Sequence, residues 1–307
     1  HAGMKRAAPW SPHWYEAEDD EASRCLQCGA AGGLRWATGG EYVYCLRCWR
    51  DYGSQAAEVI HLCAQDQGLR PPEGAGPRLV PAPPERRSPQ SPGAPAVQLE
   101  VTPEDSFDAA LRLLGDGERA PEALPPLVLN MANATWVGGG FLRDSSGQEE
   151  ELCRRSTLFP QLMEAAKVGC FPIPELGSIV LPDVAVFRER KGEDYARLGE
   201  VRRVAVITAA APCHPDLSTE AAKEQYVESM RAKVDALLSV AEHLGYVDMV
   251  LSAWGCGAFR NPPKEVARIF REALNGKFST AFRRIVFAIY DRPDWRETNY
   301  SIFKGEL

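Results

Sequence analysis

Five short apolar runs in the C-terminal two thirds of the chain constrain its fold most. They cover residues 127–131, 178–181, 204–210, 249–253 and 285–290. Stretches with helical spacing of apolar residues alternate with them, over residues 104–115, 146–166, 219–244 and 262–276. Strands that alternate with helices predict a mainly parallel sheet covered on both faces. Ligands of such sheets bind beyond the carboxyl ends of the strands, so we expect the informative loops after Leu129, Ala209 and Leu251.

Composition and charge limit the class of protein. The chain has 307 residues, of which 45% are hydrophobic and 25% charged, and its formal net charge is −7. The negative charge argues against a general nucleic-acid binder. The chain has no run of about eighteen apolar residues that would predict a membrane span, and its first ten residues lack the apolar centre of a signal peptide. We therefore expect an intracellular protein with no membrane partner, and leave a nuclear or cytoplasmic location open.

Two cysteine pairs stand out near the N-terminus. Cys25 and Cys28 form one CxxC pair, and Cys45 and Cys48 form another after sixteen intervening residues. Two such pairs can supply the four thiolates of a tetrahedral structural zinc site, although redox or unrelated thiol pairs are the alternative. The glycines and Trp36 between the pairs resemble a treble-clef finger. The sequence therefore predicts one structural Zn²⁺, and the scattered remaining cysteines favour a reducing compartment.

These patterns divide the chain into three zones. Residues 1–70 form the predicted zinc-finger module, residues 71–97 a proline-rich linker and residues 98–307 an α/β domain. The linker composition cannot bury enough apolar surface to order the segment. The finger is a candidate docking module for a protein or nucleic acid, but few basic residues surround its cysteines, so support for DNA contact is thin.

A glycine-rich loop follows the apolar run at residues 127–131. Asn133 comes first, then Gly138, Gly139 and Gly140, and seven residues later Gln148, Glu149 and Glu150. Consecutive glycines allow a ligand to lie directly on the backbone. A capping box of Ser145 with Gln148, or of Ser146 with Glu149, predicts a helix that begins near Ser146. Its N-terminus would favour a phosphate, although acidic residues in a first turn are often only dipole partners.

A second small-residue turn follows the run at residues 249–253. Gly255, Gly257 and Ala258 would let a pyrophosphate approach the backbone, and Phe259 offers a flat face for a ribose or base. The alternative is a tight strand-to-helix turn with a core phenylalanine. Cys256 has no histidine near it in sequence, so we interpret it as a small packing residue and not as a nucleophile.

Together these motifs resemble the poly(ADP-ribose) glycohydrolase family. Asn133, then GGG-x7-QEE, then WGCGAF carry the likeness, and NMANATWVGGGFLRDSSGQEEELCRRSTLFPQL is most similar to the microbial-type branch. The likeness covers residues 98–307 and leaves the cysteine module as an addition. It implies a macrodomain-like mixed sheet sandwiched by helices, with ADP-ribose in a crevice.

The resemblance also implies an activity: hydrolysis of ribose–ribose O-glycosidic bonds in poly(ADP-ribose), with release of ADP-ribose and no cofactor for catalysis. Glu150 is implied to be the catalytic acid, and Glu149 to hold ribose hydroxyls beside it. The implied partners are poly(ADP-ribose) or ADP-ribosylated macromolecules. The implied substrate contacts are Asn133, Gly138, Gly139, Gly140, Gln148, Gly255, Gly257, Ala258 and Phe259.

One position departs from the family pattern and leaves a contact open. Cys213 follows Ala210-Ala-Pro212 where an asparagine is expected. For the adenine side the candidates are Asp183, Asn299 and Phe303, and Glu151 is interpreted as a surface residue. Two rival functions share the implied pocket: removal of single ADP-ribose units from protein or nucleic acid, and non-catalytic reading of ADP-ribose. The intact QEE motif argues against a pure reader. The microbial branch suggests removal from the chain terminus.

Overall fold

A computed structural model of the chain describes residues 34–37, 42–45, 54–84, 95–117, 122–143, 145–291 and 298–307. Strands β1 (Leu34–Ala37) and β2 (Tyr42–Cys45) form an antiparallel pair of their own. Of the four predicted zinc ligands, Cys25, Cys28 and Cys48 lie outside the described residues, and only the backbone of Cys45 is described. No helix in the described ranges is long and apolar enough to cross a membrane.

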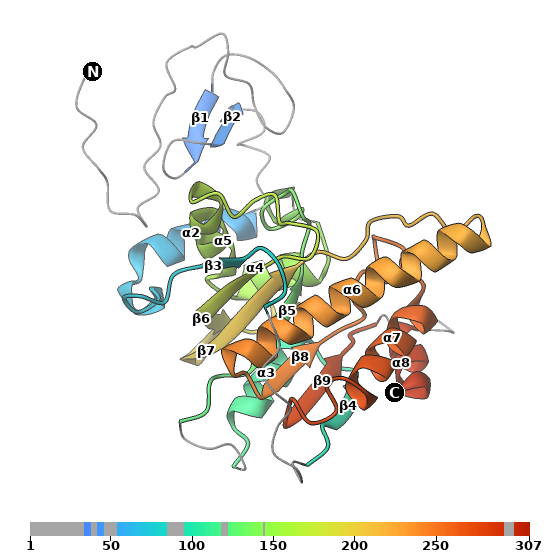
Figure 1. Cartoon of the computed structure of the whole chain (residues 1–307). Helices are drawn as coiled ribbons and strands as arrows, with labels where there is room; N and C mark the ends of the chain where they lie inside the picture. The colour runs from blue at the N-terminus through green and yellow to red at the C-terminus, as the bar shows by residue number, and fades with distance from the viewer. Residues whose placement is uncertain are drawn as a thin grey trace.

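A seven-stranded mixed sheet forms the centre of the molecule, with the strand order β3-β6-β7-β5-β8-β9-β4 (Figure 1). Neighbours from β7 to β4 run parallel, whereas β6 is antiparallel to both β3 and β7. The predicted mixed sheet is therefore confirmed. The strands are β3 (Arg78–Val80), β4 (Gln98–Thr102), β5 (Leu127–Met131), β6 (Ser178–Arg188), β7 (Arg197–Ala209), β8 (Asp248–Leu251) and β9 (Arg284–Ala288).

Helices cover both faces of this sheet, because alternate strand residues point to opposite sides. Helices α6 (Glu220–Leu244), α7 (Pro263–Asn275) and α8 (Asn299–Glu306) lie on one face (Figure 1). Leu127 and Leu129 pack with residues of these helices in one core. Val128 packs on the other face, in a core that also contains residues of four further helices of the described ranges. These are α2 (Ser54–Gln65), α3 (Ser106–Leu114), α4 (Gln148–Arg155) and α5 (Leu158–Lys167).

The sheet domain begins earlier than the predicted boundary at residue 98. Helix α2 falls within the predicted zinc-finger module, yet Ala56, Val59 and Cys63 are buried in the core beneath α4 and α5. Strand β3 falls within the predicted linker, yet it pairs with the start of β6. The three residues of β3 lie among prolines and glycines, and this composition predicts a linker. Only the pairing with β6 identifies β3 as an edge strand. Both segments thus correct the predicted domain limits.

The predicted helix over residues 146–166 is in fact two helices. Between α4 and α5 the backbone turns to the sheet: Ser156 bridges to Val186, and Thr157 Oγ1 accepts a hydrogen bond from Ala185 N at 3.0 Å. Neither predicted capping box forms, because α4 begins at Gln148 with Gly147 as its N-cap, which has no side chain to accept a bond. At Ser156 and Thr157, hydrogen bonds to β6 therefore replace the bonds that would continue the helix.

Candidate active site

The three predicted loops meet at one edge of the sheet. They follow β5, β7 and β8, which are neighbours in the order β7-β5-β8. Ala132 N donates to Ala209 O at 3.1 Å and joins the first two loops. His214 N donates to Phe259 O at 2.9 Å and joins the second to the third. The arrangement expected for parallel strands therefore brings the glycine turns together.

The first glycine turn requires glycine for two separate reasons. Gly138 and Gly139 have φ of +68° and +57°, in the left-handed region that disfavours side chains. A Cβ at Gly138 would lie 2.6 Å from the Phe159 ring. A Cβ at Gly139 would lie 2.6 Å from Glu150 Oε1 and 2.8 Å from Glu149 Oε2. The bare backbone at Gly139 therefore lets two carboxyl groups approach the same point.

Glu149 is the more deeply buried of these two carboxyl groups, with 4% of the residue exposed. Its Oε1 accepts a bond from Asn130 Nδ2 at 3.2 Å, and its Oε2 accepts one from Asn133 N at 3.0 Å. Burial raises the pKa of Glu149 to about 8; the two donors oppose this rise, and the charge of Glu150 adds to it. At neutral pH Glu149 is therefore largely protonated.

This protonation makes a stability prediction for Glu149→Gln. Between the ordinary carboxyl pKa and about 8 the folded state binds more protons than the unfolded state, so Glu149 destabilises the fold progressively as pH rises through this window. Because glutamine does not titrate, the free energy of unfolding of Glu149→Gln should exceed that of the parent at pH 8.5, by a few kcal/mol at most. At pH 5 the advantage should largely vanish. Urea unfolding at both pH values measures it.

The side-chain amide of the Glu149→Gln variant can find a hydrogen-bond partner in the folded protein. Asn130 Oδ1 has no hydrogen-bond partner within the described ranges, so a turned-over Asn130 amide can accept from the new side chain. Glu151→Gln is the matched control on the same helix. Its free energy of unfolding should not show the gain over the parent between pH 5 and pH 8.5 that we expect for Glu149→Gln. An equal stability difference between Glu149→Gln and the parent at both pH values would contradict the protonation assigned here.

Glu150 lies half-buried between two glycines. Its Oε1 accepts a hydrogen bond from Gly140 N at 2.7 Å. Its Oε2 would lie 2.4 Å from a Cβ at Gly147, so glycine at that position is also a condition of its placement. The Glu150 carboxyl group therefore lies against the glycine turn with one oxygen fixed by the backbone.

Gln148 joins the start of α4 to the end of β5. Its Oε1 accepts from Met131 N at 2.9 Å, and its Nε2 donates to Leu129 O at 2.6 Å and to Ser106 Oγ at 3.2 Å. Both ends of the amide are thus bonded within the protein. The structure gives Gln148 a role in positioning the helix turn that carries both glutamates, where the sequence predicted a substrate contact.

Two asparagines shape the loop after β5. Asn133 Oδ1 accepts bonds from Thr135 N and Trp136 N, both at 2.9 Å, and so folds the approach to the glycines. Asn130 is fully buried, and its Nδ2 donates both to Glu149 and, at 3.3 Å, to Thr208 Oγ1. Neither Asn130 nor Thr208 was predicted from the sequence as a site residue. The available signal was a lone polar residue within each of two apolar runs, residues 127–131 and 204–210.

In the second turn, Gly255 serves the loop itself. Its φ is +75°, and a Cβ there would lie 2.4 Å from Asn261 Nδ2 and 2.7 Å from Ala211 Cβ. The buried Asn261 amide donates to Pro212 O at 2.8 Å and to Gly255 O at 3.0 Å. Gly257 and Ala258 are exposed, and Phe259 is half-buried. Phe259 also packs against the core of this face of the sheet.

The remaining candidates divide between core and surface. Burial raises the pKa of Cys256 to about 12, which agrees with a packing role for this thiol. Cys213 is exposed, with its Sγ 3.2 Å from His214 Nδ1. Of the adenine candidates, Phe303 is fully buried in the core, and Asp183 lies within β6, paired with Arg203. Asn299 is the first residue of α8.

A mixed sheet that presents two adjoining carboxyl groups beside a bare-backbone turn has the parts of a glycoside hydrolase. A family described as microbial-type PARG, catalytic domain, matches residues 59–169. The poly(ADP-ribose) glycohydrolase (PARG) from Thermomonospora curvata is 30% identical, with a TM-score of 0.70 over 83% of this chain and 98% of that one. The chain belongs to the poly(ADP-ribose) glycohydrolase family.

Further solved structures connect this family to ligands. The Thermomonospora curvata enzyme bound to the inhibitor ADP-HPD has 30% identity and a TM-score of 0.67, over 83% of this chain and 98% of that one. The Deinococcus radiodurans enzyme in complex with ADP-ribose has 32% identity and a TM-score of 0.61, over 78% of this chain and 98% of that one. No curated protein sequence matches the chain.

Proposed function

We propose that this protein hydrolyses the ribose–ribose O-glycosidic bonds of poly(ADP-ribose) and releases ADP-ribose, with Glu150 as general acid and base. The observation that carries this proposal is the placement of the Glu149 and Glu150 carboxyl groups against Gly139. A relative 32% identical to this chain was solved with ADP-ribose, which supports the same ligand here.

Each group at the site has a part in the proposed reaction. The diphosphate lies along the backbone of Gly138–Gly140, with Gly257 and Ala258 opposite, and Phe259 packs on a sugar. Glu149, largely neutral at pH 7, holds ribose hydroxyls. Asn133 orients the terminal ribose from the loop that also supplies a backbone donor to Glu149. The scissile bond is thereby brought beside Glu150.

The proton on Glu150 passes to the leaving ribose oxygen as the glycosidic bond breaks, and an oxocarbenium-like sugar forms. The resulting carboxylate then removes a proton from a water that attacks the anomeric carbon. Glu150 thereby recovers a proton in place of the one that it gave to the leaving oxygen. Substrate, water and one carboxyl group supply every atom that moves, so we propose no cofactor for catalysis.

The test is release of ADP-ribose from an automodified polymer, with a mono-ADP-ribosylated protein as the parallel substrate. We expect free ADP-ribose from the polymer. Release from the mono-modified protein alone would replace this function with removal of single ADP-ribose units. Tight binding of ADP-ribose with no release from either substrate would make the protein a reader.

We propose further that Cys25, Cys28, Cys45 and Cys48 hold one structural Zn²⁺. Support comes from the pairing of β1 with β2, which sets Leu34 opposite Cys45 and makes a hairpin between the two CxxC pairs. Four cysteines at this spacing fit a tetrahedral zinc site.

For the zinc site we expect metal analysis of the parent protein to give about one zinc per chain. Cys25→Ser should lose most of it, because a three-thiolate site is incomplete. ADP-ribose release should fall less than about twofold, since the sheet domain has its own core on both faces. A parent protein without zinc, or equal zinc in parent and variant, would refute the metal assignment.

A further inference from the structure

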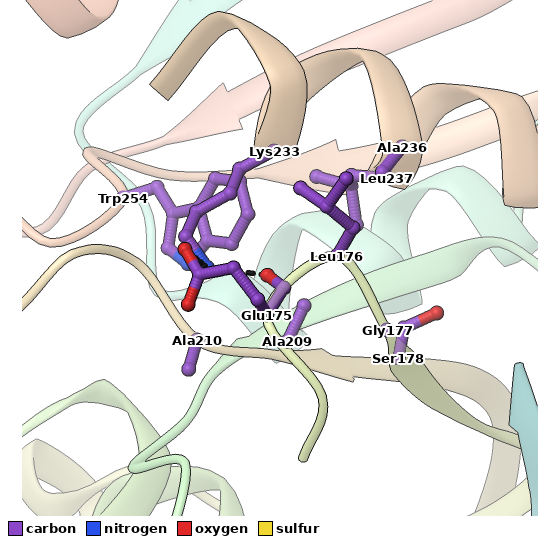
Figure 2. Close-up of a pocket in the computed structure, with 10 residues that line it drawn as sticks. All are labelled: Glu175, Leu176, Gly177, Ser178, Ala209, Ala210, Lys233, Ala236, Leu237 and Trp254. Atoms are coloured by element: carbon purple, nitrogen blue, oxygen red, sulfur yellow. Dashed lines mark hydrogen bonds and ion pairs between the residues drawn. The ribbon is translucent and has the colours of Figure 1, made fainter. Parts of the chain in front are cut away.

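Lys233 is a buried cation in the middle of α6, with only 6% of the residue exposed. Its ammonium donates a hydrogen bond to the main-chain oxygen of Glu175 and lies 2.9 Å from Glu175 Oε1 (Figure 2). The Glu175 side chain is 75% exposed, and a solvated carboxylate gives an ion pair little strength. The bond to the carbonyl is therefore the specific feature of this buried charge.

That carbonyl belongs to the loop between α5 and β6, which braces the active-site loop. Ile173 N donates to Ala134 O at 2.8 Å. Ala132, Cys170 and Ile173 pack in one small apolar cluster. The residue before Ala134 is Asn133, whose N–H donates to Glu149 Oε2. A continuous series of contacts thus joins Lys233 on one face of the sheet to the carboxyl group of Glu149 on the other.

The same place touches the other two loops of the site. The small cavity beside Lys233 is also lined by Ala209 and Ala210, where β7 ends, and by Trp254, which begins the second glycine turn. In Figure 2 the Glu175 side chain lies next to Lys233 and Trp254, whereas Ser178 points away from them. Lys233 therefore lies beside the loops that follow β7 and β8, and it is connected to the loop after β5 through the loop between α5 and β6.

We propose that Lys233 is a positioning residue for the hydrolysis. By holding the Glu175 carbonyl it fixes the loop between α5 and β6. That loop in turn fixes Asn133 and the Glu149 carboxyl relative to the bound ribose. Lys233 touches neither substrate nor the reacting atoms. The inference rests on the proposed hydrolysis, because it concerns the geometry of that site.

Lys233→Met tests it, because methionine keeps the length of the side chain and removes both the charge and the donor. We expect kcat for ADP-ribose release to fall about 10- to 100-fold, since small misplacements at a reacting centre have effects of this size. KM should change less. The apparent Tm should be retained or raised, because an apolar replacement of a buried charge is often well tolerated.

Two further variants and a hydrogen-exchange measurement serve as controls for Lys233→Met. Glu175→Gln keeps the acceptor carbonyl and should leave kcat within about twofold of the parent. Lys233→Arg supplies another long donor and should restore much of kcat. Hydrogen exchange in Lys233→Met should speed up at Ile173 while core amides of β5 and β7 stay protected. If Lys233→Met melts below the assay temperature, Lys233→Gln replaces it with the same readouts.

The outcomes separate this inference from the function on which it rests. A folded Lys233→Met that releases ADP-ribose at the parental kcat overturns the role of Lys233 and leaves the hydrolysis standing. A loss of kcat that only follows a loss of folded protein also overturns it. Failure of the parent protein to release ADP-ribose overturns the proposed function itself.

Discussion

Glu150→Gln is expected to lower the rate of ADP-ribose release by about 10²- to 10⁴-fold, the range that a positioned general acid contributes. Glutamine has neither a proton to give to the leaving oxygen nor a carboxylate to activate water. Its side-chain oxygen can still accept the bond from Gly140 N that fixes Glu150 Oε1. The geometry of the turn should therefore persist, and ADP-ribose should still bind with an affinity close to that of the parent.

The experiment compares turnover with binding. Release of ADP-ribose from polymer is measured under saturating conditions, and calorimetric titration with ADP-ribose measures the Kd. Glu151→Gln is the control from the next position of α4. Glu151 accepts bonds from Tyr195 Oη at 2.7 Å and from Lys191 N at 3.1 Å, and so ties the hairpin between β6 and β7 to the helix. That variant should lose stability while its folded fraction keeps most of its turnover.

A comparison with Glu149→Gln settles which carboxyl group is the acid. Both groups approach the point that a Cβ of Gly139 would occupy, so they lie close enough to influence one another's protonation. If Glu150 is the acid, Glu149→Gln should weaken ribose binding and reduce turnover less than Glu150→Gln does. Loss of turnover in Glu149→Gln with parental rates in Glu150→Gln would exchange the two roles.

The order of β5 to β9 was predictable because each of these strands contains a continuous apolar run, and the helices α3 to α7 that alternate with them were predictable apart from the break between α4 and α5. The positions of the loops followed from that order, so the glycine turns after β5 and β8 were expected to be neighbours. Strand β4 and helix α8 were not predicted. Neither α2 nor β3 could be assigned this way. Both become part of the domain through tertiary contacts, α2 by burying one face beneath α4 and α5, and β3 by pairing with β6.

Within the site, residue type was predictable and hydrogen bonding was not. The sequence indicates two carboxylates beside a glycine turn, but it does not reveal that Gln148 is fully engaged by β5 and Ser106. Asn130 was missed for the same reason, since only the folded structure brings it to Glu149. Glu151 was predicted to be a surface residue; it is half-buried, and the hydrogen bonds that its two carboxylate oxygens accept from Lys191 and Tyr195 could not be predicted, because these residues lie about forty positions away in the chain.

Gly139→Ala should have the second large effect, because the added methyl group falls where both carboxyl groups lie. Its Cβ would be 2.6 Å from Glu150 Oε1 and 2.8 Å from Glu149 Oε2, far inside contact distance. Either the turn or the two side chains must move. We expect ADP-ribose release to fall by about 100-fold or more, the effect of a displacement near 1 Å at a reacting centre. Affinity for ADP-ribose should weaken as well.

Gly245→Ala is the matched control for the backbone. Gly245 has φ of +85° at the C-terminal end of α6, and a Cβ there meets nothing within 4 Å. Both variants therefore carry the left-handed backbone penalty of about 1–2 kcal/mol, and both should lower Tm. Only Gly139→Ala adds the collision with the carboxyl groups. If the two variants release ADP-ribose equally fast per folded molecule, the glutamates are not confined by this turn, and the placement on which the proposed acid catalysis depends is wrong.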